Sequence, residues 1–157
     1  MTDFTELYKK YAPDVYRFAL YLSGERSEAE DIASETFVRA WTSPERIVMP
    51  TVKGYLFTIA RNLFLHRLRR RSKEVELDLS LPDSQASPHA QAEQKAELRA
   101  VLAGLHELPE MDRAAVLMRA IDGMPYEEIA QALQISVGAV RMKIHRARLA
   151  LCGLGKR

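Results

Sequence analysis

The stretch PYEEIAQALQISVGAVRMKIHRARLAL, residues 125–151, decides the fold, because its pattern predicts two short helices joined by a tight turn. The first helix is predicted to start at Pro125, since proline suits the first helical position, where a backbone N–H would be unpaired. Gln134 and Ile135 form the predicted turn, and Ser136 is the predicted N-cap of the second helix. One face of that second helix is apolar and carries Val137, Val140, Ile144, Ala147 and Leu151.

The other face of the second helix is basic. It carries Arg141, Lys143, His145, Arg146 and Arg148. A helix with an apolar back and a basic front suits the major groove of DNA, where arginine and lysine meet phosphates and guanine edges. The alternative is a solvated helix of an all-α domain. The order of helix, turn and basic helix favours DNA binding.

Charge is strongly segregated along the 157 residues, although the net charge is only +2. Residues 61–73 and 138–157 are rich in arginine and lysine and contain no acid, whereas acids collect at 25–35 and 74–97. Four arginines fall within residues 67–71, more than helix capping requires. This pattern predicts two contacts on one polyanion, with other surfaces left for protein partners.

Several classes of function are disfavoured by what the sequence lacks. It contains no glycine-rich phosphate loop and no metal-ligand spacing of cysteine and histidine, so we expect neither an enzyme nor a cofactor. The single Cys152 permits no internal disulfide, and we interpret it as a small apolar residue near a helix end. With no signal-peptide pattern and no apolar run of membrane-spanning length, the predicted location is the cytoplasm, without membrane insertion.

The remaining segments also have helical periodicity, and none alternates like a strand, so the predicted class is all-α. Pro13 is expected to kink or divide the first helix, and a capping box is expected at Ser27–Glu30. In the helix that follows, the spacing favours a core position for Trp41 and places Glu28 on a charged outer face. A further helix is predicted over 51–71, and Gly123 is predicted to end the helix that starts at Pro109. The predicted architecture is two small helical domains joined by a flexible linker, with a helix-turn-helix in the second. The boundaries are 1–72, 73–92 for the linker and 93–157. Each domain is near the lower size limit for an independent core, so docking on the other or on a partner would stabilise both.

Three segments in order resemble bacterial sigma factors of the extracytoplasmic-function class, which have only regions two and four. SEAEDIASETFVRAW (27–41) resembles region 2.2, and KGYLFTIARNLFLHRLRRR (53–71) resembles regions 2.3 and 2.4. Residues 108–151 resemble region 4, with typical YEEIA and HRAR pieces. The resemblance implies a sigma-70 family factor that directs promoter-specific transcription initiation.

The resemblance also implies partners and contact residues. Core RNA polymerase would be bound at its β′ clamp and β flap, and an anti-sigma factor is a further implied partner. The polymerase contacts would be Asp31, Glu35, Val38 and Arg39. The contacts with the −10 element would be Tyr55, Arg61, Asn62, His66, Arg69 and Arg70. The contacts with the −35 element would be Ser136, Arg141, Met142, Lys143, His145, Arg146 and Arg148.

Two alternatives stay open. A helix-turn-helix regulator could bind duplex operator DNA without acting as a polymerase subunit, but it needs no second basic helix at 53–71. A polymerase-binding adaptor without DNA contact would be insensitive to loss of Arg141 and Arg146.

Overall fold

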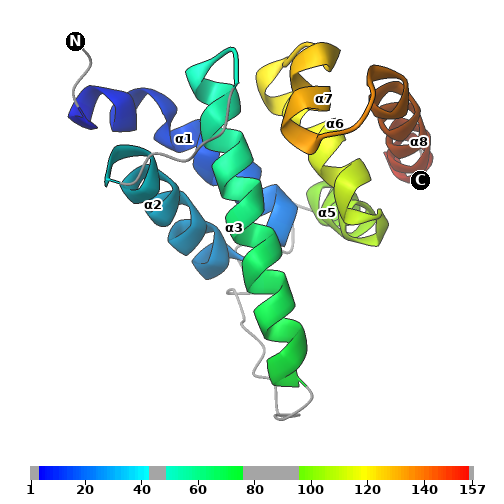
Figure 1. Ribbon diagram of the computed structural model, residues 1–157. Coiled ribbons are helices and arrows are strands. Elements are labelled where there is room, and N and C mark those ends of the chain that lie inside the picture. Colours follow the sequence, from blue (N-terminus) through cyan, green and yellow to red (C-terminus); the bar gives the residue numbers. More distant parts are fainter. Residues whose placement is uncertain (1–3, 43–48, 76–95, 156–157) are drawn as a thin grey trace.

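The computed structural model describes residues 4–42, 49–75 and 96–155, which form seven helices and no strand (Figure 1). The predicted all-α class is therefore confirmed. The N-terminal domain contains α1 (Phe4–Ser23), α2 (Arg26–Thr42) and α3 (Val52–Val75). The C-terminal domain contains α5 (Ala96–Glu107), α6 (Glu110–Asp122), α7 (Tyr126–Leu133) and α8 (Val137–Gly155). Most of the predicted linker lies outside the described residues.

The N-terminal domain is built on aromatic and aliphatic side chains of α1. This helix continues through Pro13, so the proline does not divide it. Val15, Phe18 and Leu22 are fully buried, and the rings of Phe18 and Phe57 stack with centroids 4.6 Å apart. These contacts join α1 to α3 at the centre of the domain.

Three details of α2 and α3 differ from the prediction. Helix α2 already begins at Arg26, and the Ser27 hydroxyl donates to the Glu25 carboxylate at 3.4 Å, so the expected capping box is wrong. Trp41 is half-exposed and makes an edge contact with Phe4, although the spacing had favoured a core position. Helix α3 continues to Val75, past the basic run.

Backbone geometry at the helix ends organises the C-terminal domain. Helix α6 ends at Gly123, as predicted, and the left-handed φ of 67° there is a conformation that glycine adopts without strain. Pro125 was predicted to occupy the first helical position of α7. It occupies the N-cap position instead, with φ −61° and ψ 150°. Extended backbone at Pro125 turns the chain sharply between α6 and α7.

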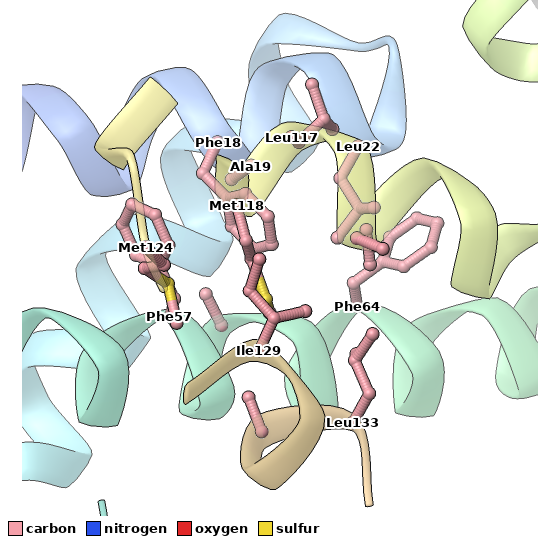
Figure 2. Packing of buried hydrophobic residues seen from close by; sticks show 14 of the residues in the cluster. Phe18, Ala19, Leu22, Phe57, Phe64, Leu117, Met118, Met124, Ile129 and Leu133 are labelled. Atoms are coloured by element: carbon pink, nitrogen blue, oxygen red, sulfur yellow. The ribbon is translucent and has the colours of Figure 1, made fainter. Parts of the chain in front are cut away.

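The two domains share one hydrophobic core (Figure 2). Helix α1 packs against α6 and α5, and α3 packs against α7. Side chains from all four of α1, α3, α6 and α7 meet in this core, among them Phe18, Leu22, Phe57, Met118, Ile129 and Leu133. The domains are therefore docked on each other, one of the two possibilities that their small size suggested.

Candidate nucleic-acid and polymerase interfaces

The predicted helix-turn-helix is present as α7, a short turn and α8. Gln134 adopts a left-handed φ of 60° and ends α7, and the Ile135 N–H donates to the Ala130 carbonyl at 3.1 Å. The Ser136 hydroxyl accepts from the Ala139 N–H at 3.1 Å, which confirms the predicted N-cap. Buried Ile129, Leu133, Val140, Ile144 and Ala147 fix the two helices against each other.

The outer face of α8 presents most of the predicted −35 residues to solvent. Exposed side chains there are Ser136, Arg141, Met142, His145, Arg146 and Arg148. Met142 is 65% exposed, so its side chain is open to van der Waals contact with a partner surface. The Arg141 guanidinium lies 5.8 Å from the centre of the Tyr126 ring, so α7 helps to position it.

A buried carboxylate holds two of the basic side chains of α8. Asp112 of α6 is 1% exposed and accepts from Arg146 Nε at 3.1 Å and from Arg146 Nη2 at 3.2 Å. It also accepts from Lys143 Nζ at 3.3 Å. Sequence reasoning missed Asp112, because an acid in the first turn of a helix already has a local explanation in the helix dipole.

Helix α3 carries a second polar face. Asn62, His66, Arg69 and Arg70 are all exposed, and their spacing places them along one side of the helix. Tyr55 is half-buried near the start of the same helix. All six predicted −10 residues belong to α3, and these five have side chains that are exposed or half-buried.

Arg61, the sixth predicted −10 residue, points away from solvent. It is 7% exposed and donates from Nε and Nη2 to the two carboxylate oxygens of Glu110 in α6, both at 2.7 Å. A planar guanidinium paired with both oxygens of a carboxylate is a strong charge-assisted contact. In this arrangement of the domains, Arg61 has no open face toward a nucleic acid.

Helix α2 carries the predicted polymerase contacts on its outer side. Asp31 and Val38 are exposed, and Glu35 pairs with Arg39 at 3.3 Å. Glu28 had been assigned to this solvated face, and that assignment is wrong. Its carboxylate is buried and pairs with Arg67 and Arg71 of α3. Arg67 also reaches Asp31 at 3.3 Å, so α2 and α3 are tied by charge as well as by packing.

Residues 4–42, 49–75 and 96–155 contain no cluster of three or more potential metal ligands. None of the described helices combines the length and apolarity needed to span a membrane. Cys152 is an exposed free thiol three residues before the end of α8.

Comparison with known proteins explains why two basic helices occur in one chain. Residues 7–74 match the family described as Sigma-70 region 2, and residues 98–151 match Sigma-70, region 4. The chain is 34% identical to the ECF RNA polymerase sigma factor SigM of Bacillus subtilis, over 97% of this chain and 94% of that protein. The chain belongs to the ECF sigma factors. This membership makes it a sigma factor that directs transcription initiation, and it disfavours the operator-binding regulator.

Other similar proteins agree with this assignment. The chain is 37% identical to the ECF RNA polymerase sigma factor SigE of Mycolicibacterium smegmatis, over 94% of this chain but only 60% of that protein. The structure of the sigma factor RpoE in complex with the anti-sigma factor NepR, from Bartonella quintana, is similar with a TM-score of 0.83. That match has 27% identity and covers 99% of this chain and 98% of the other. The structure of CnrH in complex with the cytosolic domain of CnrY gives a TM-score of 0.68 at 26% identity, covering 96% and 86% of the two chains.

Proposed function

We propose that this ECF sigma factor binds core RNA polymerase through α2 and reads the −10 and −35 promoter elements with α3 and α8. The observation that carries the proposal is the pair of exposed polar and basic faces on two helices from different domains. A sigma factor needs two such faces, whereas a repressor needs one. The polymerase supplies the chemistry of RNA synthesis, and this chain acts in the cytoplasm as a non-enzymatic subunit.

The polymerase contact is assigned to the outer side of α2. Asp31, Glu35 and Val38 recur at helical spacing, and Arg39 extends the same surface. Mixed charges around an exposed valine suit a specific protein contact, because the apolar centre contributes affinity and the charged rim sets orientation. The β′ clamp is the proposed partner of this side of α2, and the β flap is the proposed partner of the C-terminal domain.

The DNA contacts are divided between strand capture and duplex reading. Asn62 and His66 offer hydrogen-bonding groups, and Arg69 and Arg70 offer charge for a phosphate backbone, as a reader of the separated −10 strand requires. On α8, Arg141 and Met142 lie in the half of the helix near its N-terminus, which reaches base edges in the major groove. Arg146 and Arg148 lie further along and are assigned to phosphates.

The domains are proposed to be 1–72 for region 2 and 93–157 for region 4, with a linker at 73–92. An anti-sigma factor is a further proposed partner, because the two solved sigma factors RpoE and CnrH are each in complex with a partner protein, in the first case the anti-sigma factor NepR. The exposed thiol of Cys152 is given no role in this proposal.

Selection of promoters from a random DNA library by core polymerase plus this chain tests the proposal. We expect two enriched elements at a fixed spacing. Replacing Arg141 by alanine should relax or weaken the upstream element, whereas replacing Asn62 by alanine should affect the downstream one. A single enriched duplex site, bound equally well without polymerase, would contradict the proposal.

A further inference from the structure

The strongest feature that the proposed function leaves unexplained is the way the C-terminal domain covers part of the N-terminal domain. The contact is apolar at its centre, where Phe57 and Phe18 meet Met118, Met124 and Ile129 (Figure 2). Inter-domain contacts of this apolar kind hold domains in one arrangement, whereas small polar contacts permit free motion. The docked arrangement is therefore a defined state of the molecule.

Charged groups of the C-terminal domain surround this centre and pair with the N-terminal domain. Glu110 holds Arg61 through two bonds of 2.7 Å. Lys53 of α3 bridges Asp122 at 2.6 Å and Asp14 of its own domain at 2.9 Å. These two hydrogen bonds raise the pKa of Lys53 and keep the ammonium charged. Arg113 of α6 donates to the Leu22 carbonyl of α1 at 2.6 Å.

Two glycines of the N-terminal domain make room for side chains of the C-terminal domain. A Cβ atom at Gly54 would lie 2.1 Å from Glu128 Oε2, and Glu128 also accepts a hydrogen bond from the Thr51 hydroxyl. A Cβ atom at Gly24 would lie 2.0 Å from the Nε2 atom of His106. A Cβ atom at either position would displace the end of the facing side chain, so α5 and α7 approach the N-terminal domain closely where it has glycine.

The docked state is incompatible with promoter recognition at two elements. A compact chain of this length has a radius of gyration of about 15 Å, whereas elements about 25 base pairs apart lie roughly 85 Å apart along B-DNA. The two reading helices must therefore separate before both elements are bound. Separation would also release Arg61 from Glu110.

We propose that Glu110 acts as an internal competitor for Arg61 in the docked state, because it occupies the guanidinium that the −10 strand binds once the domains have separated. A carboxylate accepting two parallel N–H bonds presents the same chemistry to arginine as a phosphate does. The proposal rests on the proposed function, because it takes Arg61 as a DNA contact. Glu110 is thus a regulatory residue, and it makes no contact with DNA itself.

The test measures domain separation and DNA binding in the same full-length variants. Spin labels on the exposed native Cys152 of α8 and on a Lys9→Cys substitution in α1 report the distance between the domains by double electron–electron resonance. A fluorescein-labelled random-sequence single strand reports DNA binding, because phosphate contacts need no particular sequence. Glu107→Gln is the matched control, since it removes the same charge from an exposed site three residues earlier.

Glu110→Gln should raise the ratio of open to closed molecules about tenfold or more, because it leaves a buried guanidinium without its counter-charge. It should also tighten binding of the labelled strand several-fold, whereas Glu107→Gln should match the parent chain. In an Arg61→Gln/Glu110→Gln double variant, the domains should open without the gain in DNA binding. Gly54→Leu gives a second route to the open state, because it fills the place of the Glu128 carboxylate with a residue that favours helix.

Unchanged distances in both Glu110→Gln and Gly54→Leu would overturn the proposal. Opening without any gain in DNA binding over Glu107→Gln would overturn it as well, because Arg61 would then not be withheld. Failure of the proposed function is a separate result. It would be seen as absence of initiation by core polymerase with the parent chain and with the opened variants alike.

Discussion

Replacing Asp112 by asparagine tests whether a buried carboxylate orients the proposed −35 helix. The change keeps the shape of the side chain and removes its charge. The carboxylate is 1% exposed, and it binds Arg146 through two hydrogen bonds and Lys143 through one. An amide at this position would present an N–H2 group to two cations, so at least part of the network would be lost.

The expected loss of stability follows from how exposed each partner is. Hydrogen bonds to charged groups are worth about 1.5–3 kcal/mol when both partners are shielded from water. The Arg146 side chain is 59% exposed, so its contribution is reduced by solvent to at most about 1 kcal/mol. Lys143 is 22% exposed and retains more of its value. Together they predict a loss of about 2 kcal/mol, or a fall of about 4–8 °C in the melting temperature.

Urea and thermal unfolding followed by circular dichroism measure this change. Asp31→Asn is the matched control, because the Asp31 carboxylate is 65% exposed and its pair with Arg67 should contribute less than about 1 kcal/mol. A midpoint for Asp112→Asn that equals that of the parent chain would refute the reasoning. The hydrogen bonds of Asp112 to Lys143 and Arg146 would then make no measurable contribution to the free energy of unfolding.

Three further outcomes are expected. Arg148→Ala should weaken binding of the holoenzyme to its promoter and make its salt dependence shallower by about one counterion, because Arg148 is assigned to a phosphate, whereas Lys9→Ala on α1 should leave the slope unchanged. Val38→Asp should reduce the affinity for core polymerase about tenfold or more without changing the melting temperature. Val52 is similarly exposed, and Val52→Asp should leave this affinity unchanged. Equal affinities of the two variants would exclude α2 as the docking surface. Burial, assisted by the charge of Arg113, lowers the pKa of His106 from its ordinary value of 6.5. The unfolded chain therefore binds the proton more readily, so this part of the stability is present above pH 6.5 and is lost as the pH falls below it. Melting curves of His106→Gln should lack that dependence, and an unchanged pH profile would show that His106 does not carry it.

The helix-turn-helix was predictable because local rules determine it. Apolar spacing defines the inner faces of α7 and α8, and Ser136 caps α8 through its own backbone neighbour Ala139. Gly123 ends α6 for an equally local reason, its left-handed φ. Features of this kind need no knowledge of distant residues.

The ion pairs between and within the domains could not be predicted, because their partners lie far apart in the sequence. Glu28 and Glu128 both occur in first turns of helices, where the helix dipole already accounts for an acid. Only the tertiary structure shows that Glu28 forms ion pairs with Arg67 and Arg71, and that Glu128 accepts a hydrogen bond from Thr51. Arg61 was predicted as a DNA contact, and nothing in the local sequence indicates that it pairs with Glu110, 49 residues later.

Glycine positions carried a usable signal that the sequence interpretation did not exploit. Gly54 lies in the first turn of α3, and glycine is a weaker helix former than alanine. Glycine at such a place indicates a close approach by another group. Here that group is Glu128 from the other domain.

Reconstituted transcription tests the central claim most directly. Core RNA polymerase is incubated with this chain on a promoter obtained by selection, and the transcripts are sequenced from their 5′ ends. We predict that RNA begins at one position downstream of the selected elements and only when the chain is present. Absence of initiation on every selected sequence, while the chain alone binds the same duplex tightly, would contradict the account.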